Sequence, residues 1–453
     1  MGYRMRKFLQ KLFAFILRIY FRRVEVFGEE HVPEDGPVIF VLNHYNALID
    51  PLFILCLAPR DVSFLAKSTL FRMPIVGFLT KKFDSIPVYR KQDQGEKGAG
   101  NMTGNQKTFA ACRELLSKGG SMALFPEGIS HNKPNLQPFK SGTARIALGA
   151  ASMQKGDQPV RIVPAGLYYT EKQIFRSDAL MCYGPSVEVE VVELDENFEP
   201  PREAVHALTD QLKEALAKVT LEAKHDEVLS LVEKAEGIFS STSKNDLAEE
   251  MEMRKRFLRA YDKLQENHHD RLNDLKDRID AYASELNQWG VQADKIKAEN
   301  FKFSVVMKFI LKRLLIVPIL VPLAILGTLI HYLPYRLIGT IATRVAKRDT
   351  DMLSTVKILG SILFFPLTWG LIGGGLWYAF SWQIGLAAFV LAPITGLAAN
   401  GFWESLYDTL RRSRAFGLFM ARRNVFDNLV EERRQIRKEI FALGELVGEL
   451  PEA

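Results

Sequence analysis

The sequence predicts an α/β domain, with a largely parallel sheet flanked by helices, followed by a charged helical arm and a C-terminal transmembrane helical region. Short apolar strands alternate with helical patterns from residue 24 to about residue 200, as is typical of such a sheet. Residues 225–300 are strongly polar. Residues 358–403 are 46 consecutive uncharged positions, whereas one helical membrane crossing needs about 20.

The composition excludes several classes of protein. A net charge of +6 over 453 residues is too small to indicate nucleic-acid binding. Cys56, Cys112 and Cys182 lie far apart and lack metal-ligand spacing, so we expect them to be reduced packing residues. The sequence contains no metal motif and no dinucleotide-binding loop, so we expect neither a metal nor a cofactor.

Residues 1–23 predict a basic amphipathic helix. Phe8, Leu12, Phe15 and Ile19 recur at helical spacing, and the segment contains several basic residues but no acid. A signal peptide is a poor fit because the segment lacks an uninterrupted apolar core. A helix that lies in the membrane interface fits the pattern, and a surface helix packed on its own domain is the alternative.

Residues 24–200 are expected to form the α/β domain. The predicted strands are 37–43, 121–128, 160–169 and 186–194, and the predicted helices between them are 108–117 and 143–153. The first three strands are nearly continuous apolar runs, as expected where helices cover both faces of a sheet.

Residues 201–303 predict a charged helical arm. Its first helix carries one apolar stripe (205–219), and its polar part, 225–300, is a candidate for self-association or for binding a protein partner. His268 and His269 are adjacent in this arm and could ligate a metal. A solvated helix surface is the better interpretation of these two histidines, because no second ligand cluster accompanies them.

Residues 304–403 predict the membrane region. Three prolines interrupt the apolar segment 314–335, which we expect to be re-entrant. Residues 358–403 fit a transmembrane hairpin that turns near "AFSWQIG". Basic residues flank the hairpin on both sides, so the positive-inside rule predicts that both flanks, and a C-terminal helix at 404–453, are cytoplasmic.

Four short blocks carry polar residues that could support chemistry. They are "NHYNALIDP" with His44 and Asp50, "SIPVYRK" with Arg90, "FPEGISHNKPNLQPFKSGTARIAL" with Glu127, Gly128, Lys140 and Arg145, and "IVPAGL" around Pro164. The histidine and the aspartate follow a predicted buried strand, where they could also merely stabilise a loop. Alone, the pair is a weak signal, and the four blocks in order are a specific one.

These blocks resemble the glycerophosphate and lysophosphatidate acyltransferase family over roughly residues 24–195. Two departures stand out. The family's usual spacing is His-x4-Asp, whereas five residues separate His44 from Asp50. Most members read F-P-E-G-T-R, whereas Ile129 and Ser130 follow "FPEG" here. In these residues after "FPEG", the chain resembles the subgroup that includes fungal glycerol-3-phosphate/dihydroxyacetone-phosphate acyltransferases. Members of that subgroup also carry membrane segments after the catalytic domain.

Acyl transfer from a thioester to an alcohol needs a base that takes the hydroxyl proton as the oxygen attacks. Histidine, with an ordinary pKa near ~6.5, is neutral and basic enough at cellular pH. A carboxylate on the other ring nitrogen fixes the tautomer and stabilises the imidazolium. We therefore expect His44 to be the catalytic base and Asp50 its partner. Because the substrate hydroxyl attacks directly, no serine or cysteine nucleophile is required.

The phosphate of the substrate needs cations, and Arg90, Lys140 and Arg145 are the candidates. The resemblance places Arg90 at the glycerophosphate end and assigns Glu127 and Gly128 to acceptor binding. Glu127 could bind the acceptor's hydroxyl or organise the phosphate-binding arginine. Arg145 lies within a predicted helix, so an ordinary surface role is equally compatible with the pattern, and Arg90 could be a structural ion-pair partner.

The predicted function is that of an integral membrane O-acyltransferase of glycerophospholipid biosynthesis, with its catalytic domain on the cytoplasmic face. The expected donor is acyl-CoA or acyl-carrier protein, and the expected acceptor is glycerol 3-phosphate or dihydroxyacetone phosphate. Membrane lipids are the other expected partners, and nucleic acid is not expected. Three alternatives remain: a 1-acylglycerol-3-phosphate acyltransferase that makes phosphatidic acid, a phospholipid transacylase, and a lipid-binding scaffold without turnover.

Overall fold

The computed structural model describes residues 2–88, 101–154, 158–239, 246–293, 296, 303–346 and 350–449. The chain forms two compact units. The sheet unit comprises Met1–Glu222, Asp246–Ala248 and Arg348–Thr355, and the helical unit comprises Ala223–Asn245, Glu249–Lys347 and Val356–Ala453. Each unit is described by itself.

The sheet unit is built on one sheet with the strand order β1-β7-β6-β2-β5-β3-β4, and β8 pairs with β6. All pairs are parallel except β6–β7 and β6–β8. The predicted fold class, a largely parallel sheet flanked by helices, is confirmed. The strands are β1 Arg23–Phe27, β2 Val38–Leu42, β3 Val62–Lys67, β4 Ile86–Val88, β5 Ser121–Leu124, β6 Arg161–Tyr169, β7 Asp178–Tyr183 and β8 Val187–Glu188.

The apolar runs at 37–43, 121–128 and 160–169 become β2, β5 and β6, the central strands of the sheet. The prediction of a strand over 186–194 is wrong beyond its start, because only Val187–Glu188 pairs. The cause lies in the register. Strand β8 runs antiparallel to β6, and Glu188 already pairs with Arg161, the first residue of β6, so the residues after Glu188 run past the start of that strand.

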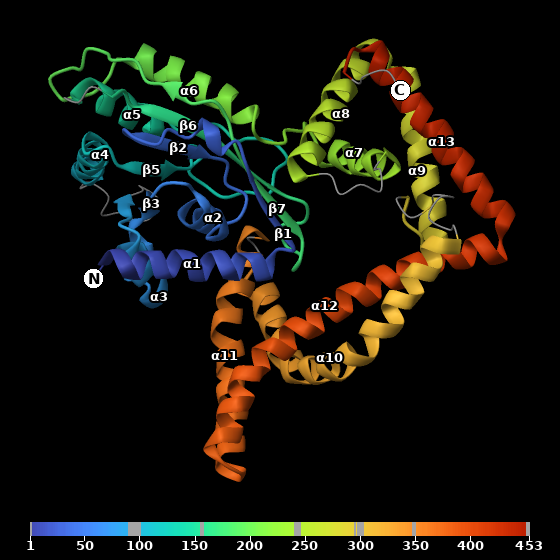
Figure 1. Ribbon diagram of the computed structural model, residues 1–453. Coiled ribbons are helices and arrows are strands. Elements are labelled where there is room, and N and C mark those ends of the chain that lie inside the picture. Colours follow the sequence, from blue (N-terminus) through green and yellow to red (C-terminus); the bar gives the residue numbers. More distant parts are fainter. Residues whose placement is uncertain are drawn as a thin grey trace. The chain divides into compact units, whose positions relative to one another are not determined.

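Helices cover both faces of the sheet, as the continuous apolar strands require (Figure 1). Helices α5 and α6 lie over one face, and α1 and α2 lie over the other. The predicted apolar stripe of α6 is buried, from Val205 at 7% exposure to Leu216 at 0%. The sheet unit therefore runs to Glu222, beyond the predicted boundary at residue 200. Its helices are α1 Gly2–Tyr20, α2 Ile49–Leu57, α3 Pro74–Lys82, α4 Asn101–Ser117, α5 Gly142–Met153 and α6 Arg202–Ala217.

Helix α1 is apolar on two sides. Leu9, Phe13 and Leu17 are buried, and α1 packs against α2, so the helix does pack on its own domain. Phe8 and Phe15 nevertheless remain 60% and 57% exposed. This exposed apolar stripe is what a helix that lies in a membrane interface needs.

The helical unit contains three helices that are long and apolar enough to cross a membrane, at Leu320–Val345, Leu353–Ala379 and Trp382–Ala421. The first belongs to α10, which is helical throughout Phe303–Val345 despite the prolines at 318, 322 and 334. Apolar membrane helices tolerate proline because neighbouring helices and local adjustments satisfy the freed backbone groups. Re-entry of 314–335 stays a prediction. The helices are α7 Asp226–Phe239, α8 Leu247–Asn267, α9 His269–Trp289, α10, α11 Leu353–Ala379, α12 Trp382–Ala421 and α13 Arg423–Leu446.

The charged arm packs within the helical unit. The apolar face of α9 is buried, and α9 contacts α7 and α13. His268 and His269 lie at the α8–α9 junction, and the described residues contain no cluster that could hold a metal. Cys56, Cys112 and Cys182 all lie in the described part of the chain and form no disulfide there, and burial raises the pKa of Cys56 and of Cys112 to about 12.

Candidate active site

The loop between β2 and α2 lies at the carboxyl edge of the parallel strands, which is where α/β sheets place their ligands. Its first residue, Asn43, is fully buried. The Asn43 amide donates to the carbonyl of Leu167 on β6 at 2.9 Å and accepts from the Leu167 N–H at 2.7 Å. These two bonds fix the point at which the loop leaves the sheet.

His44 and Asp50 meet in this loop. The His44 Nδ1 atom lies 2.9 Å from Asp50 Oδ2, and their side chains are 14% and 0% exposed. The additional residue between them is accommodated because Asp50 lies in the first turn of α2, with its N–H bonded to the carbonyl of Asn46. A carboxylate in the first turn is also favoured by the helix dipole.

The carboxylate of Asp50 is held by further donors. Oδ2 accepts from the Asn46 N–H at 2.7 Å, and Oδ1 accepts from the Tyr169 hydroxyl at 2.7 Å. Burial, together with the charge of Asp50, raises the pKa of Tyr169 well above its ordinary value, so the phenol stays protonated and donates. Tyr169 was not predicted as a site residue, although it ends the predicted strand 160–169 at the same sheet edge as His44.

The contact with Asp50 determines which nitrogen of His44 can act as a base. A carboxylate that accepts from Nδ1–H leaves the lone pair on Nε2. No described residue forms a hydrogen bond with His44 Nε2. The imidazole stacks on Phe125, with ring centroids 3.9 Å apart and an interplanar angle of 4°. The ring is therefore oriented from one face and one edge, and its second nitrogen remains available.

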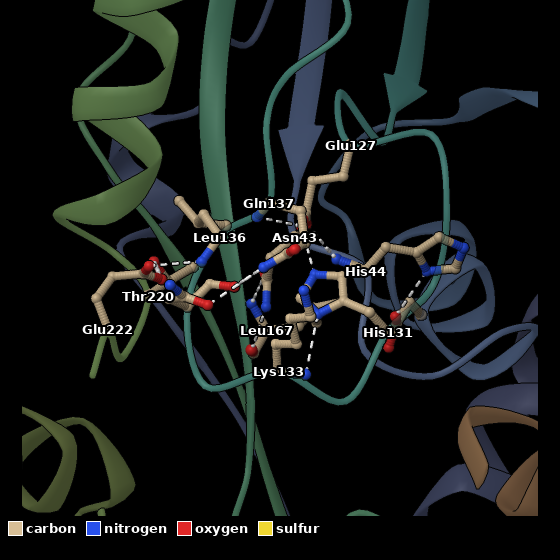
Figure 2. Close-up of polar contacts among 12 residues, drawn as sticks. Asn43, His44, Glu127, His131, Lys133, Leu136, Gln137, Leu167, Thr220 and Glu222 are labelled. Atoms are coloured by element: carbon tan, nitrogen blue, oxygen red, sulfur yellow. Dashed lines mark hydrogen bonds and ion pairs between the residues drawn. The ribbon is translucent and has the colours of Figure 1, made fainter. Parts of the chain in front are cut away.

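Glu127 lies in the loop between β5 and α5, the second loop of the site, and joins it to the loop between β2 and α2. Its carboxylate is buried and accepts from the His44 N–H at 3.1 Å and from the Gln137 N–H at 2.8 Å. His131 Nε2 bonds to the same carboxylate, and the His131 N–H donates to the His44 carbonyl at 3.0 Å. Figure 2 shows Glu127 between His44 and Gln137. Both oxygens are thus occupied within the protein, which favours an organising role.

Gly128 and Lys140 lie side by side. Gly128 has a φ of +69°, and a Cβ there would come within 2.6 Å of Lys140 Nζ. The Lys140 N–H bonds to the carbonyl of Pro126 at 2.8 Å, which brings the lysine back beside the "FPEG" turn. The Lys140 side chain is exposed. A cation therefore lies next to the turn that carries Glu127.

Arg90 and Arg145 were both candidates for binding the substrate's phosphate, and the structure describes only the second of them. Arg90 lies outside the described residues. Arg145 Nε donates to Glu199 Oε2 at 2.8 Å, its second nitrogen bonds the other oxygen, and its guanidinium lies 4.9 Å from the Phe109 ring centroid. A bidentate ion pair with an aromatic contact is a structural arrangement. This geometry favours the surface role that the sequence left open for Arg145.

Comparisons with known proteins find acyltransferases along most of the chain. A family model described as acyltransferase matches residues 23–168, and one for the C-terminal domain of glycerol-3-phosphate acyltransferase 2 matches residues 238–449. An uncharacterized acyltransferase of Schizosaccharomyces pombe is 23% identical, over 96% of this chain and 80% of that protein. Glycerol-3-phosphate O-acyltransferase 1 of Saccharomyces cerevisiae is 26% identical, over 78% of this chain.

The chain spans 58% of the length of that budding-yeast relative. Among solved structures, the 1-acyl-sn-glycerophosphate acyltransferase PlsC from Thermotoga maritima is 20% identical. That match covers 48% of this chain and 83% of the other, with a TM-score of 0.34.

The match of residues 23–168 to the acyltransferase model, together with these relatives, defines the class as an acyltransferase. The chain contains an acyltransferase domain at residues 23–168 and, after it, a C-terminal domain of the glycerol-3-phosphate acyltransferase 2 type at residues 238–449.

Proposed function

We propose that this protein transfers a fatty acyl group from acyl-CoA or acyl-carrier protein to a hydroxyl of glycerol 3-phosphate or dihydroxyacetone phosphate. The observation that carries the proposal is the His44–Asp50 pair, in which a fully buried carboxylate orients an imidazole whose Nε2 is unengaged among the described residues. The budding-yeast relative is a glycerol-3-phosphate O-acyltransferase, which supports this choice of acceptor.

In the proposed reaction, the acceptor hydroxyl attacks the thioester carbonyl carbon while His44 Nε2 takes the hydroxyl proton. The tetrahedral intermediate then collapses, the C–S bond breaks, and the imidazolium returns its proton to the departing thiolate. The products are an ester and a free thiol. Asp50 stabilises the imidazolium between these two transfers. Ser130 and Ser141 carry no acyl group.

We also propose that this chemistry takes place at the cytoplasmic surface of a membrane. The exposed apolar stripe of α1 and the three membrane-capable helices support attachment to a lipid surface. The basic residues on both flanks of the 358–403 hairpin support a cytoplasmic orientation of those flanks. There the acyl chain of the donor can remain out of water.

An acceptor panel tests the proposed function. The full chain, purified in detergent, is given palmitoyl-CoA alone or with glycerol 3-phosphate, dihydroxyacetone phosphate or 1-acylglycerol 3-phosphate. We expect thiol release and a lipid product with glycerol 3-phosphate or dihydroxyacetone phosphate. Product only from 1-acylglycerol 3-phosphate would move the assignment to phosphatidic acid synthesis. In a parallel assay a phospholipid replaces palmitoyl-CoA; product from that donor alone would indicate a transacylase, and no turnover with either donor would leave a binding scaffold.

Lys140 and Arg145 are expected to differ in their effect on the acceptor. Lys140→Gln should raise the apparent KM for glycerol 3-phosphate roughly tenfold, the equivalent of one charge-assisted hydrogen bond to phosphate. Arg145→Gln is the matched control because its cation is already paired with Glu199, so its KM should remain within about twofold of wild type. Initial rates against acceptor concentration measure both values. An unchanged KM in Lys140→Gln would remove the lysine from the phosphate site.

A further inference from the structure

The residues that begin helix α11 pack against the active-site loops. Although α11 is one of the three membrane-capable helices, its start belongs to the sheet unit, which includes Arg348–Thr355. Three polar side chains of this segment are nearly or fully buried, with Asp351, Ser354 and Thr355 exposed by 9%, 1% and 2%. Buried polar groups need hydrogen-bond partners, and here those partners all lie in loops at the carboxyl edge of the sheet.

Each side chain bonds a different loop. The Leu48 N–H donates to Thr355 Oγ1 at 3.1 Å, the Ser130 hydroxyl donates to Asp351 Oδ2, and the Ser354 hydroxyl donates to the Lys172 carbonyl. Leu48 is the N-cap residue of α2 and lies between His44 and Asp50. Ser130 lies in the turn whose Glu127 accepts from the His44 N–H.

We propose that Asp351, Ser354 and Thr355 are positioning residues for acyl transfer, forming a clamp on three loops at the carboxyl edge of the sheet, two of which build the His44–Asp50 site. This inference rests on the proposed function. Through Leu48, the clamp acts on the loop that sets the distance between His44 Nδ1 and the Asp50 carboxylate. Through Ser130, it acts on the turn whose Glu127 holds the His44 backbone. The active site is therefore completed by a segment at least 182 residues further along the chain than the loops it holds.

The clamp gives the C-terminal region a role in turnover besides attachment to the membrane. If the segment only anchored α11, loss of one hydroxyl would lower stability without a selective effect on the rate. If it positions the loops, loss of the Thr355 hydroxyl should lower kcat and leave the KM for glycerol 3-phosphate nearly unchanged, because Leu48 and Thr355 are not among the residues proposed to bind phosphate.

Three substitutions in one helix test the proposal. Thr355→Val removes the acceptor of the Leu48 N–H and keeps the side-chain shape, whereas Thr355→Ser keeps the hydroxyl. Thr368→Val is the matched control, because the Thr368 hydroxyl only bonds the carbonyl of Phe364 in its own helix, at 2.8 Å. We expect kcat to fall about tenfold in Thr355→Val, as for an unsatisfied buried N–H, and to stay within about twofold of wild type in the other two.

Hydrogen–deuterium exchange supplies a second readout that needs no turnover. The peptide covering residues 43–55 should exchange faster in Thr355→Val than in Thr368→Val or wild type, because the Leu48 amide loses its acceptor. Equal exchange and equal kcat in Thr355→Val and Thr368→Val would overturn the clamp. A wild-type protein without acyl transfer would instead contradict the proposed function, and the exchange result would still decide whether the segment holds the loop.

Discussion

Replacing His44 by alanine is expected to abolish acyl transfer while leaving the fold intact. Loss of a general base costs about 10²–10⁴-fold in rate. The fold should survive because Asp50 keeps two donors, the Asn46 N–H and the Tyr169 hydroxyl, so its buried carboxylate stays hydrogen-bonded. Thiol release with palmitoyl-CoA and glycerol 3-phosphate measures the rate, and thermal unfolding in detergent measures stability.

His206→Ala is the matched control for this experiment. His206 is exposed on α6, away from the loops of the site in sequence, and its removal should change neither the rate nor the unfolding temperature. A His44→Ala protein that turns over at the rate of His206→Ala would contradict the assignment of the base.

Asp50→Asn is expected to lower kcat by about 10²–10⁴-fold. The Tyr169 hydroxyl can rotate to accept from the new amide NH₂, so the amide oxygen can still face His44 Nδ1 and Asn46 N–H. The geometry is then retained, and what is lost is the negative charge that stabilises the imidazolium. Initial-rate kinetics should show the loss in kcat, with the KM for glycerol 3-phosphate changed far less.

Tyr169→Phe provides the comparison for Asp50→Asn. It removes one of the bonds to the carboxylate but keeps the charge and the ring that packs on Phe21 and Phe53. We expect a fall of at most about tenfold, in line with the loss of one hydrogen bond. An Asp50→Asn protein no slower than Tyr169→Phe would show that the charge of Asp50 takes no part in the reaction.

The central strands and the reactive pair could be predicted from sequence because local pattern determines them. Strands β2, β5 and β6 are continuous apolar runs, and His44 follows the first of them directly. Strands β1, β3, β4 and β7 were not predicted. Strands β1 and β4 are edge strands that are only partly buried; charged residues interrupt the apolar pattern of β1, and β4 has only three residues.

The partners of the pair could not be predicted because they come from distant parts of the chain. Tyr169 reaches Asp50 across 119 positions, and Thr355 reaches Leu48 across 307. No periodicity in a single sequence reports contacts of that separation. The same limit applies to the ion pair of Arg145, because its partner Glu199 lies well beyond the end of α5.

The boundary of the sheet unit illustrates a related limit. The predicted boundary lies at residue 200, but α6 continues the fold because its apolar stripe covers β6 and β2. Gly166 on β6 lets the chain after α6 approach closely, since a Cβ there would lie 1.9 Å from the Val219 carbonyl oxygen. Packing of this kind determines where a unit ends, and a composition profile does not record it.

Rapid mixing of the purified protein with palmitoyl-CoA, before any acceptor is added, tests direct attack by the hydroxyl most sharply. Thiol release should stay at background, the intact mass of the protein should be unchanged, and release should begin only when glycerol 3-phosphate is supplied. A stoichiometric burst of thiol without acceptor, together with a protein heavier by one acyl group, would mean that a side chain attacks the thioester first and that His44 does not deprotonate the acceptor in that step.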